Sequence, residues 1–136
     1  EWLSGEGSDE EADSFLAHWF EHEATPDHEV GQWLDLCQHR KVIGTNNDPR
    51  RAEYIERDMG FGARVEKVLA SGHIGAVKPN AGFYQAVEDW SGIAPARILL
   101  IDDNAKYIDG AHRRGWNAFH FTNETRNRLP RLLRID

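Results

Sequence analysis

The sequence predicts an α/β fold with a doubly wound parallel sheet, and two observations carry this prediction. From Lys41 onwards, short apolar segments alternate with helix-like segments, as in strand–helix–strand units of a parallel sheet. Residues 98–101 are four successive aliphatic side chains without polar alternation, which is typical of a strand buried on both faces. A chain of 136 residues suits one domain with a core of useful size.

The strands and helices of this region follow one another in order. Asp48 is a good capping residue for the first helix, Pro49 suits its first position, and Gly60 ends it. Lys78 precedes a proline, which favours extended geometry, so we expect it on a loop near solvent that enters the next helix. Strands are expected at 41–45, 65–71, 96–103 and 117–121, and helices at 48–60, after Pro79, at 105–115 and, broken and basic, at 126–134.

Residues 1–40 differ in character, because they are acidic and rich in tryptophan. Ser8 is a candidate helix cap, and the apolar residues 15, 16, 19 and 20 follow helical spacing. A second helix is expected within 25–40. His18 and His22 have the spacing of a two-histidine metal face, but no third ligand is evident, so a solvated edge is favoured. Two helices and no strand indicate a small helical layer beside the sheet domain of residues 41–136.

Composition excludes several classes of function. The formal net charge of −7 and the lack of a basic stripe argue against a nucleic-acid partner. No apolar run reaches the length of a membrane span, and no signal-peptide pattern opens the chain. Cys37 is the only cysteine, which excludes a disulfide framework and fits a reducing cytoplasm.

An acidic pair, Asp102 and Asp103, ends the aliphatic strand. Ligands of open α/β sheets bind beyond the carboxyl ends of the strands, where this pair is expected to lie. Neighbouring carboxylates repel each other, and a hard cation such as Mg²⁺ would relieve that repulsion. The alternative is a solvated strand end at which one aspartate caps the next helix.

Three other polar residues are expected at the same edge of the sheet. Thr45 and Asn46 end the first predicted strand of the region, and Lys78 follows the second. A hydroxyl group and a lysine can hold phosphoryl oxygens, while a carboxylate-bound Mg²⁺ neutralises the remaining charge. Each residue alone is an ordinary turn or loop residue. Their combination in this order indicates phosphoryl transfer.

Three segments of the chain resemble the second, third and fourth motifs of the haloacid dehalogenase-like (HAD) superfamily, in its helical-cap branch. They read VIGTNND, GAVKPNAGFY and ILLIDDNAKYIDGAHRRGW. The resemblance implies a Rossmann-like HAD core, with residues 1–40 as part of a helical cap. It also implies that Thr45 and Asn46 bind the phosphoryl group and that Lys78 steadies it and the nucleophile. Asp103 then corresponds to the Mg²⁺-binding aspartate, with Asp102 beside it.

Two departures from this pattern stand out. Many relatives carry an Asp or Asn where this chain has Tyr107, which weakens any further metal ligation there. No DxDGT-type motif with the nucleophilic aspartate is present. In the family, the strand that carries it lies centrally, between the strands ending at Thr45 and Asp102. We therefore expect this central strand to be missing and the chain to be part of a longer protein. Otherwise another segment, or a second copy, must fill the gap.

Three functions remain open on the sequence. The first is a Mg²⁺-dependent phosphatase that acts on a small phosphate ester through an aspartyl-phosphate. The second is a haloacid dehalogenase, which the acidic pair disfavours because halide displacement requires no cation. The third is a non-catalytic binding or regulatory domain. Since the nucleophile is absent, these 136 residues alone are expected not to turn over a phosphate ester.

Overall fold

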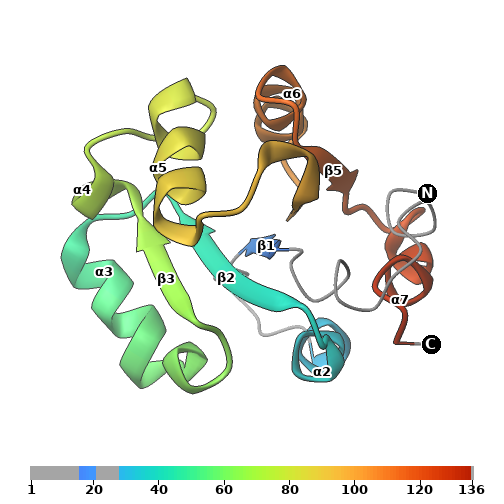
Figure 1. Ribbon diagram of the computed structural model, residues 1–136. Helices are drawn as coiled ribbons and strands as arrows, with labels where there is room; N and C mark the ends of the chain where they lie inside the picture. Colours follow the sequence, from blue (N-terminus) through green and yellow to red (C-terminus); the bar gives the residue numbers. More distant parts are fainter. Residues whose placement is uncertain (1–15, 21–27, 136) are drawn as a thin grey trace.

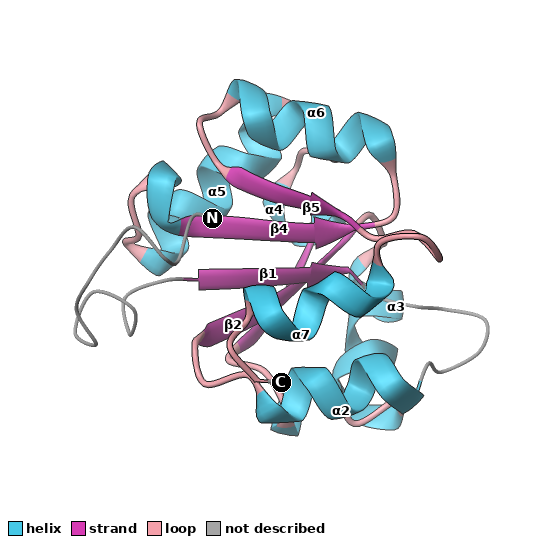
Figure 2. Cartoon of the chain, turned by 90° about the vertical axis from the view of Figure 1, so that its right-hand side faces the viewer, coloured by secondary structure: helices cyan, strands magenta, loops and turns pink. Residues whose placement is uncertain are grey.

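The computed structural model describes residues 16–20 and 28–135, which form a five-stranded parallel sheet with the strand order β3-β2-β1-β4-β5. Every pair of neighbouring strands is parallel, and the arrows in Figure 2 accordingly point the same way. All carboxyl ends therefore meet at one edge of the sheet. The strands are β1 (Leu16–Phe20), β2 (Arg40–Thr45), β3 (Lys67–Ala70), β4 (Ile98–Asp102) and β5 (Asn117–His120).

Helices cover both faces of the sheet (Figures 1 and 2). Apolar residues of α5 and α6 pack with one set of strand side chains, and those of α2, α3 and α7 pack with the other. The helices are α2 (His28–Leu36), α3 (Pro49–Glu53), α4 (Ser71–Ile74), α5 (Ala81–Ser91), α6 (Ala105–Arg113) and α7 (Leu129–Leu132). Short 3₁₀ turns lie at Phe61–Ala63, Pro95–Arg97 and Arg126–Arg128. This doubly wound arrangement confirms the predicted fold class.

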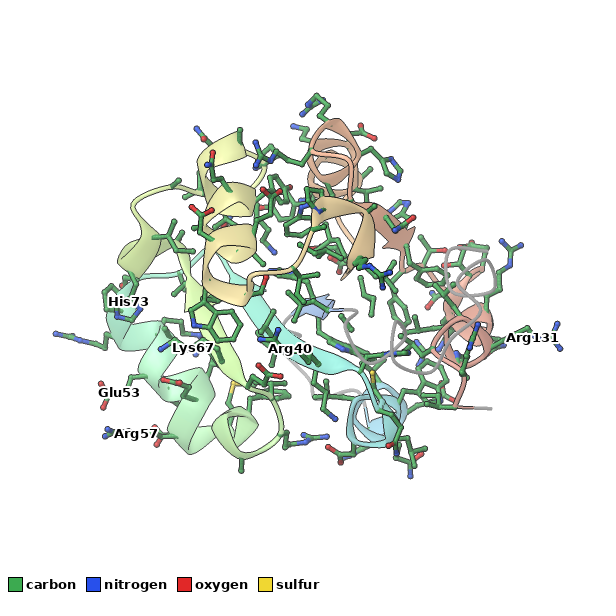
Figure 3. The ribbon with its side chains drawn as sticks, in the orientation of Figure 1. Arg40, Glu53, Arg57, Lys67, His73 and Arg131 are labelled. Atoms are coloured by element: carbon green, nitrogen blue, oxygen red, sulfur yellow. The ribbon has the colours of Figure 1, made fainter. Side chains whose placement is uncertain are left out.

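The local signals after Lys41 predict their elements well. The Asp48 side chain accepts a hydrogen bond from the backbone N–H of Arg51, and Pro49 is the first residue of α3. A π-helical turn, Tyr54–Asp58, continues this helix before Gly60 with its positive φ of 78°. Its outer surface is charged: Glu53 and Arg57 form an exposed ion pair of 3.0 Å and project away from the sheet (Figure 3).

The segment Leu16–Phe20 corrects two predictions, because it forms a central strand and not a cap helix. It pairs with β2 on one side, where Phe20 is opposite Gly44, and with β4 on the other, where Trp19 is opposite Ile101. The position expected to be empty is therefore filled from within this chain. The flanking strands β2 and β4 provide backbone hydrogen-bond partners along both edges of the segment. These hydrogen bonds favour a strand over the helix that the spacing of its apolar residues predicts.

The same strand also corrects the expected environment of His18. Side chains alternate between the two faces of β1, so that Leu16 joins one core cluster while Ala17 and Trp19 join the other. His18 shares the face of Leu16, where its ring lies against Phe83 and Trp116, and it is fully buried and not at a solvated edge. Its partner in the two-histidine prediction, His22, lies outside the described residues.

The second predicted helix is shorter than expected. α2 ends at Leu36, and β2 already begins at Arg40. Leu34 anchors α2 in the core cluster on its face of the sheet. Within the part of the chain that the structure describes, no helix has the length and apolar character needed to cross a membrane.

Candidate functional site

The predicted site residues gather at the carboxyl edge of the sheet. Thr45 is the last residue of β2 and Asp102 the last of β4, and β1 lies between these two strands. Both side chains are buried. Asp103 follows in the exposed turn, while Asn46 begins the loop after β2. This arrangement follows from the parallel sheet, which brings strand ends together however far apart they are in sequence.

Lys78 completes the cluster through an ion pair with Asp102. Its Nζ lies 3.1 Å from Asp102 Oδ2 and donates to the carbonyl oxygen of Gly44 at 3.2 Å. Only 5% of Lys78 and 2% of Asp102 are exposed. The expectation of a loop lysine near solvent is therefore wrong: Lys78 is in the loop before α5, but its side chain is drawn into the sheet by the carboxylate.

The aspartates of the acidic pair lie in different environments. Burial raises the pKa of Asp102, and Lys78 and a backbone hydrogen bond oppose that shift. Both oxygens of Asp102 are engaged, because Oδ1 accepts from the backbone N–H of Asn104 at 3.0 Å. Asp103 is exposed, and its backbone oxygen is 3.1 Å from His120 Nε2. Asp103 thus presents the carboxylate of the pair that is open to a ligand.

Asn46 fixes the loop that carries Lys78. Its Oδ1 accepts from the backbone N–H of Lys78 at 2.9 Å, and its Nδ2 donates to the carbonyl oxygen of Lys78 at 3.1 Å. The same Nδ2 is 3.1 Å from the hydroxyl oxygen of Tyr107. The Tyr107 ring also lies 4.9 Å from Lys78 Nζ. The sequence did not predict these contacts of Tyr107 with Asn46 and Lys78, because it shows only that position 107 lacks the Asp or Asn of many relatives.

The Thr45 hydroxyl accepts one hydrogen bond and donates none to the residues that the structure describes. The Thr45 oxygen accepts a hydrogen bond from the side-chain nitrogen of Asn47. A hydroxyl group that accepts one bond still has its O–H to donate. Thr45 and Lys78 can therefore offer a neutral donor and a cation from one edge of the sheet. Hydroxyl donors and lysine cations of this kind can bind phosphoryl oxygens.

The carboxylates of this edge suit a hard cation in their chemistry. Mg²⁺ prefers oxygen ligands, needs few protein carboxylates and keeps several waters. Asp103 meets this requirement, whereas Asp102 is already engaged by Lys78. Within residues 16–20 and 28–135, no three His, Cys, Asp or Glu side chains cluster as a metal site. Among the site residues that the structure describes, Asp103 has the chemistry of a single Mg²⁺ ligand.

The central strand adds no carboxylate to the site within its described residues. β1 consists of LAHWF and contains neither Asp nor Glu. Both ring nitrogens of His18 and the indole nitrogen of Trp19 are buried without a hydrogen-bond partner. Among the described residues, no other buried side-chain nitrogen or oxygen lacks a partner in this way. Such groups cost about 1–3 kcal/mol each. β1 therefore fills the centre of the sheet with unsatisfied polar atoms.

Comparison with curated proteins relates one segment of the chain to a phosphatase. No family model matches the chain. A phosphatase from Mycobacterium tuberculosis (strain CDC 1551 / Oshkosh) is 38% identical over 55 residues, which cover 40% of this chain. The matched segment spans 25% of the length of that phosphatase.

Solved structures establish the fold more broadly. An uncharacterized protein from Corynebacterium glutamicum superposes with a TM-score of 0.75 at 22% identity, covering 90% of this chain and 97% of the other. A HAD-like family hydrolase from Porphyromonas gingivalis gives 0.68 at 24% identity, covering 79% and 58%. A HAD family enzyme from Bacteroides thetaiotaomicron, crystallised with magnesium and inorganic phosphate, gives 0.61 at 18% identity, covering 71% and 52%. The chain has the parallel α/β fold of HAD-like hydrolases.

Proposed function

We propose that this chain carries the phosphate- and cation-binding residues of a Mg²⁺-dependent HAD-like phosphatase that acts on a small phosphate ester. The observation that carries the proposal is the buried Lys78–Asp102 pair of 3.1 Å, at the sheet edge that Thr45 also reaches. A lysine held by a carboxylate and a carbonyl oxygen is positioned before any ligand arrives. Preorganised charges of this kind stabilise a transferring phosphoryl group without reorganisation.

Each residue has a distinct task in this proposal. The Thr45 hydroxyl donates to a phosphoryl oxygen, and Lys78 Nζ neutralises charge on the phosphoryl group. Asp103 is the ligand for Mg²⁺, which, when bound, neutralises further phosphoryl charge. The segment shared with the Mycobacterium tuberculosis phosphatase supports the reaction class. The magnesium and phosphate bound to the Bacteroides thetaiotaomicron enzyme support the ligands.

The nucleophile requires a carboxylate that the described part of β1 lacks. In the proposed reaction, an Asp oxygen attacks phosphorus and the bond from phosphorus to the alcohol oxygen breaks. The leaving oxygen takes a proton from solvent water and departs as the alcohol. Water then hydrolyses the aspartyl-phosphate to inorganic phosphate and the free carboxylate. We propose that a strand from a segment outside these 136 residues supplies this Asp. That strand would replace β1 at the centre of the sheet. The unsatisfied nitrogens of His18 and Trp19 support this replacement, because an aliphatic strand would leave no such groups.

Hydrolysis of p-nitrophenyl phosphate with Mg²⁺ tests the proposal. We expect the 136-residue chain to bind inorganic phosphate, as followed by NMR titration, without turning over the ester. Extension upstream through an Asp-bearing strand should restore turnover, and Asn at that Asp should abolish it again. Mg²⁺-dependent turnover by the short chain, surviving repurification, would show that the nucleophile is misplaced. Absence of phosphate binding to both forms would overturn the proposed site.

A further inference from the structure

A hollow of about 640 Å³ lies beside the candidate site. Its walls come from the loop after β2 and from α4 with the loop that follows it, which lie side by side in Figure 1. The backbone N–H of Gly72 and the hydroxyl of Ser71 both donate to the carbonyl oxygen of Asn47, at 2.9 and 3.2 Å. A side chain at Gly72 would come within 2.6 Å of Pro49. The two walls are therefore held tightly against each other.

Direct hydrogen bonds connect residues of the hollow to Thr45 and Lys78. Asn47 lines it and donates to the Thr45 hydroxyl oxygen, while Asn46 lines it and holds the backbone of Lys78. Asn46 and Asn47 thus each line the hollow and contact one of the two residues proposed to bind phosphate, so the hollow is next to that proposed site. The volume is in the range of small-molecule sites.

The lining favours an uncharged, hydroxyl-rich group. Asn80 Oδ1 accepts from the backbone N–H of Gly82, which leaves the Asn80 amide nitrogen without a partner among the described residues. The side-chain oxygen of Asn47 likewise has no hydrogen-bond partner among the described residues. Val77 adds an apolar surface that is 52% exposed. No Lys or Arg is among the lining residues, and Asp48 is the charged side chain, so an anionic group would be repelled.

We infer that this hollow binds the alcohol portion of the substrate and selects a neutral polyol or sugar phosphate over a phosphorylated acid. The inference rests on the proposed phosphate site. Amide groups provide both donors and acceptors for sugar hydroxyls, and Val77 can pack against a carbon skeleton. A carboxylate on the alcohol portion of the ligand would meet Asp48 and no cation among the lining residues.

Calorimetric titration of the chain with three probes tests this selectivity. The probes are inorganic phosphate, glucose 6-phosphate and 3-phosphoglycerate. We expect glucose 6-phosphate to bind about tenfold more tightly than 3-phosphoglycerate, a difference of about 1.4 kcal/mol. Val77→Lys places a cation at the exposed rim and should remove this preference. Leu36→Lys is the matched control, since Leu36 is 54% exposed on α2 and does not line the hollow, and it should retain the preference.

The outcomes separate the hollow from the phosphate site. Binding of inorganic phosphate with equal affinities for the two organic probes would overturn the inference and leave the phosphate site standing. An unchanged preference in Val77→Lys would also overturn it. Failure of all three probes to bind would refute both. Thermal unfolding of the two lysine variants checks that both fold, and neither exposed substitution is expected to lower the unfolding temperature appreciably.

Discussion

The side-chain amide of Asn46 pairs with both backbone polar groups of Lys78, at 2.9 and 3.1 Å. The two residues are 32 positions apart, so this contact fastens the loop before α5 to the end of β2. Lys78 Nζ then reaches Asp102 at the end of β4. Three separate strand connections are thereby held in one arrangement. The lysine proposed to bind phosphate is thus positioned by an amide group that need not touch phosphate.

Replacing Asn46 by Ala should weaken both folding and phosphate binding. It leaves the backbone groups of Lys78 without their side-chain partner, at a cost of about 1–3 kcal/mol in the free energy of unfolding. Tyr107→Phe is the control, because it removes one hydrogen bond and should cost about 1 kcal/mol or less. Urea unfolding and NMR titration with inorganic phosphate measure the two effects. Phosphate affinity that is unchanged in Asn46→Ala would contradict the positioning role.

Lys78→Met should destabilise the protein at neutral pH by about 3–5 kcal/mol, because it leaves Asp102 buried and unpaired. Burial raises the pKa of Asp102 above its ordinary value of 3.8. The loss of stability in Lys78→Met should be small below pH 3.8, because the Asp102 carboxyl group is then protonated in both the folded and the unfolded chain. It should grow as the pH rises through the raised pKa of Asp102. Urea unfolding across the pH range measures it.

The double variant Lys78→Met with Asp102→Asn provides the check on this explanation. It removes the buried charge as well as its partner and should recover most of the lost stability. If the double variant is no more stable than Lys78→Met, the uncompensated carboxylate is not the cause.

Asp103→Asn should lower the affinity for Mg²⁺, whereas Asp102→Asn should affect it less. Asp103 is exposed and open to a cation, and Asp102 already pairs with Lys78. Calorimetric titration of Mg²⁺ in the presence of inorganic phosphate compares the variants. Equal affinity in wild type and Asp103→Asn would remove Asp103 from the proposed cation site.

Gly44→Ala should be severely destabilising, because the added Cβ atom would overlap the His18 ring. A Cβ atom at Gly44 would lie 2.0 Å from Cε1 and Nε2 of the His18 ring, which is packed in the core. His18→Ala removes that ring, so Gly44→Ala should cost little in its background. A double-mutant cycle by urea unfolding measures the coupling. Additive effects would show that β1 does not take this register beside β2.

His18 should also make the protein sensitive to acid. Burial and the nearby Lys78 hold the pKa of His18 well below its ordinary value of 6.5. The unfolded chain therefore binds a proton that the folded chain refuses, and stability falls as the pH decreases from 6.5 towards the lowered pKa. His18→Leu should flatten that part of the stability profile and raise stability at pH 7. An unchanged slope between pH 6.5 and 5 would exclude His18 as its source.

Much of the fold and of the site edge could be predicted from residues that are close in sequence. Residues 98–101 need no partner to indicate a buried strand, and Asp48 with Pro49 begins a helix by local hydrogen bonding and a fixed φ. Parallel strands then dictate that Thr45 and Asp102 end at one edge. These inferences hold because each depends on the side chains of a single segment.

The tertiary structure alone decided the identity of the central strand and the burial of Lys78. The five residues of β1 fit helical and strand periodicity alike, and backbone partners from β2 and β4 select the strand. The residue before a proline is predictably extended, but the direction of the Lys78 side chain depends on a carboxylate 24 residues away. Asn46 and Tyr107 meet across 61 residues. Such contacts exist only after the sheet has assembled, because their energies come from partners that no local segment contains.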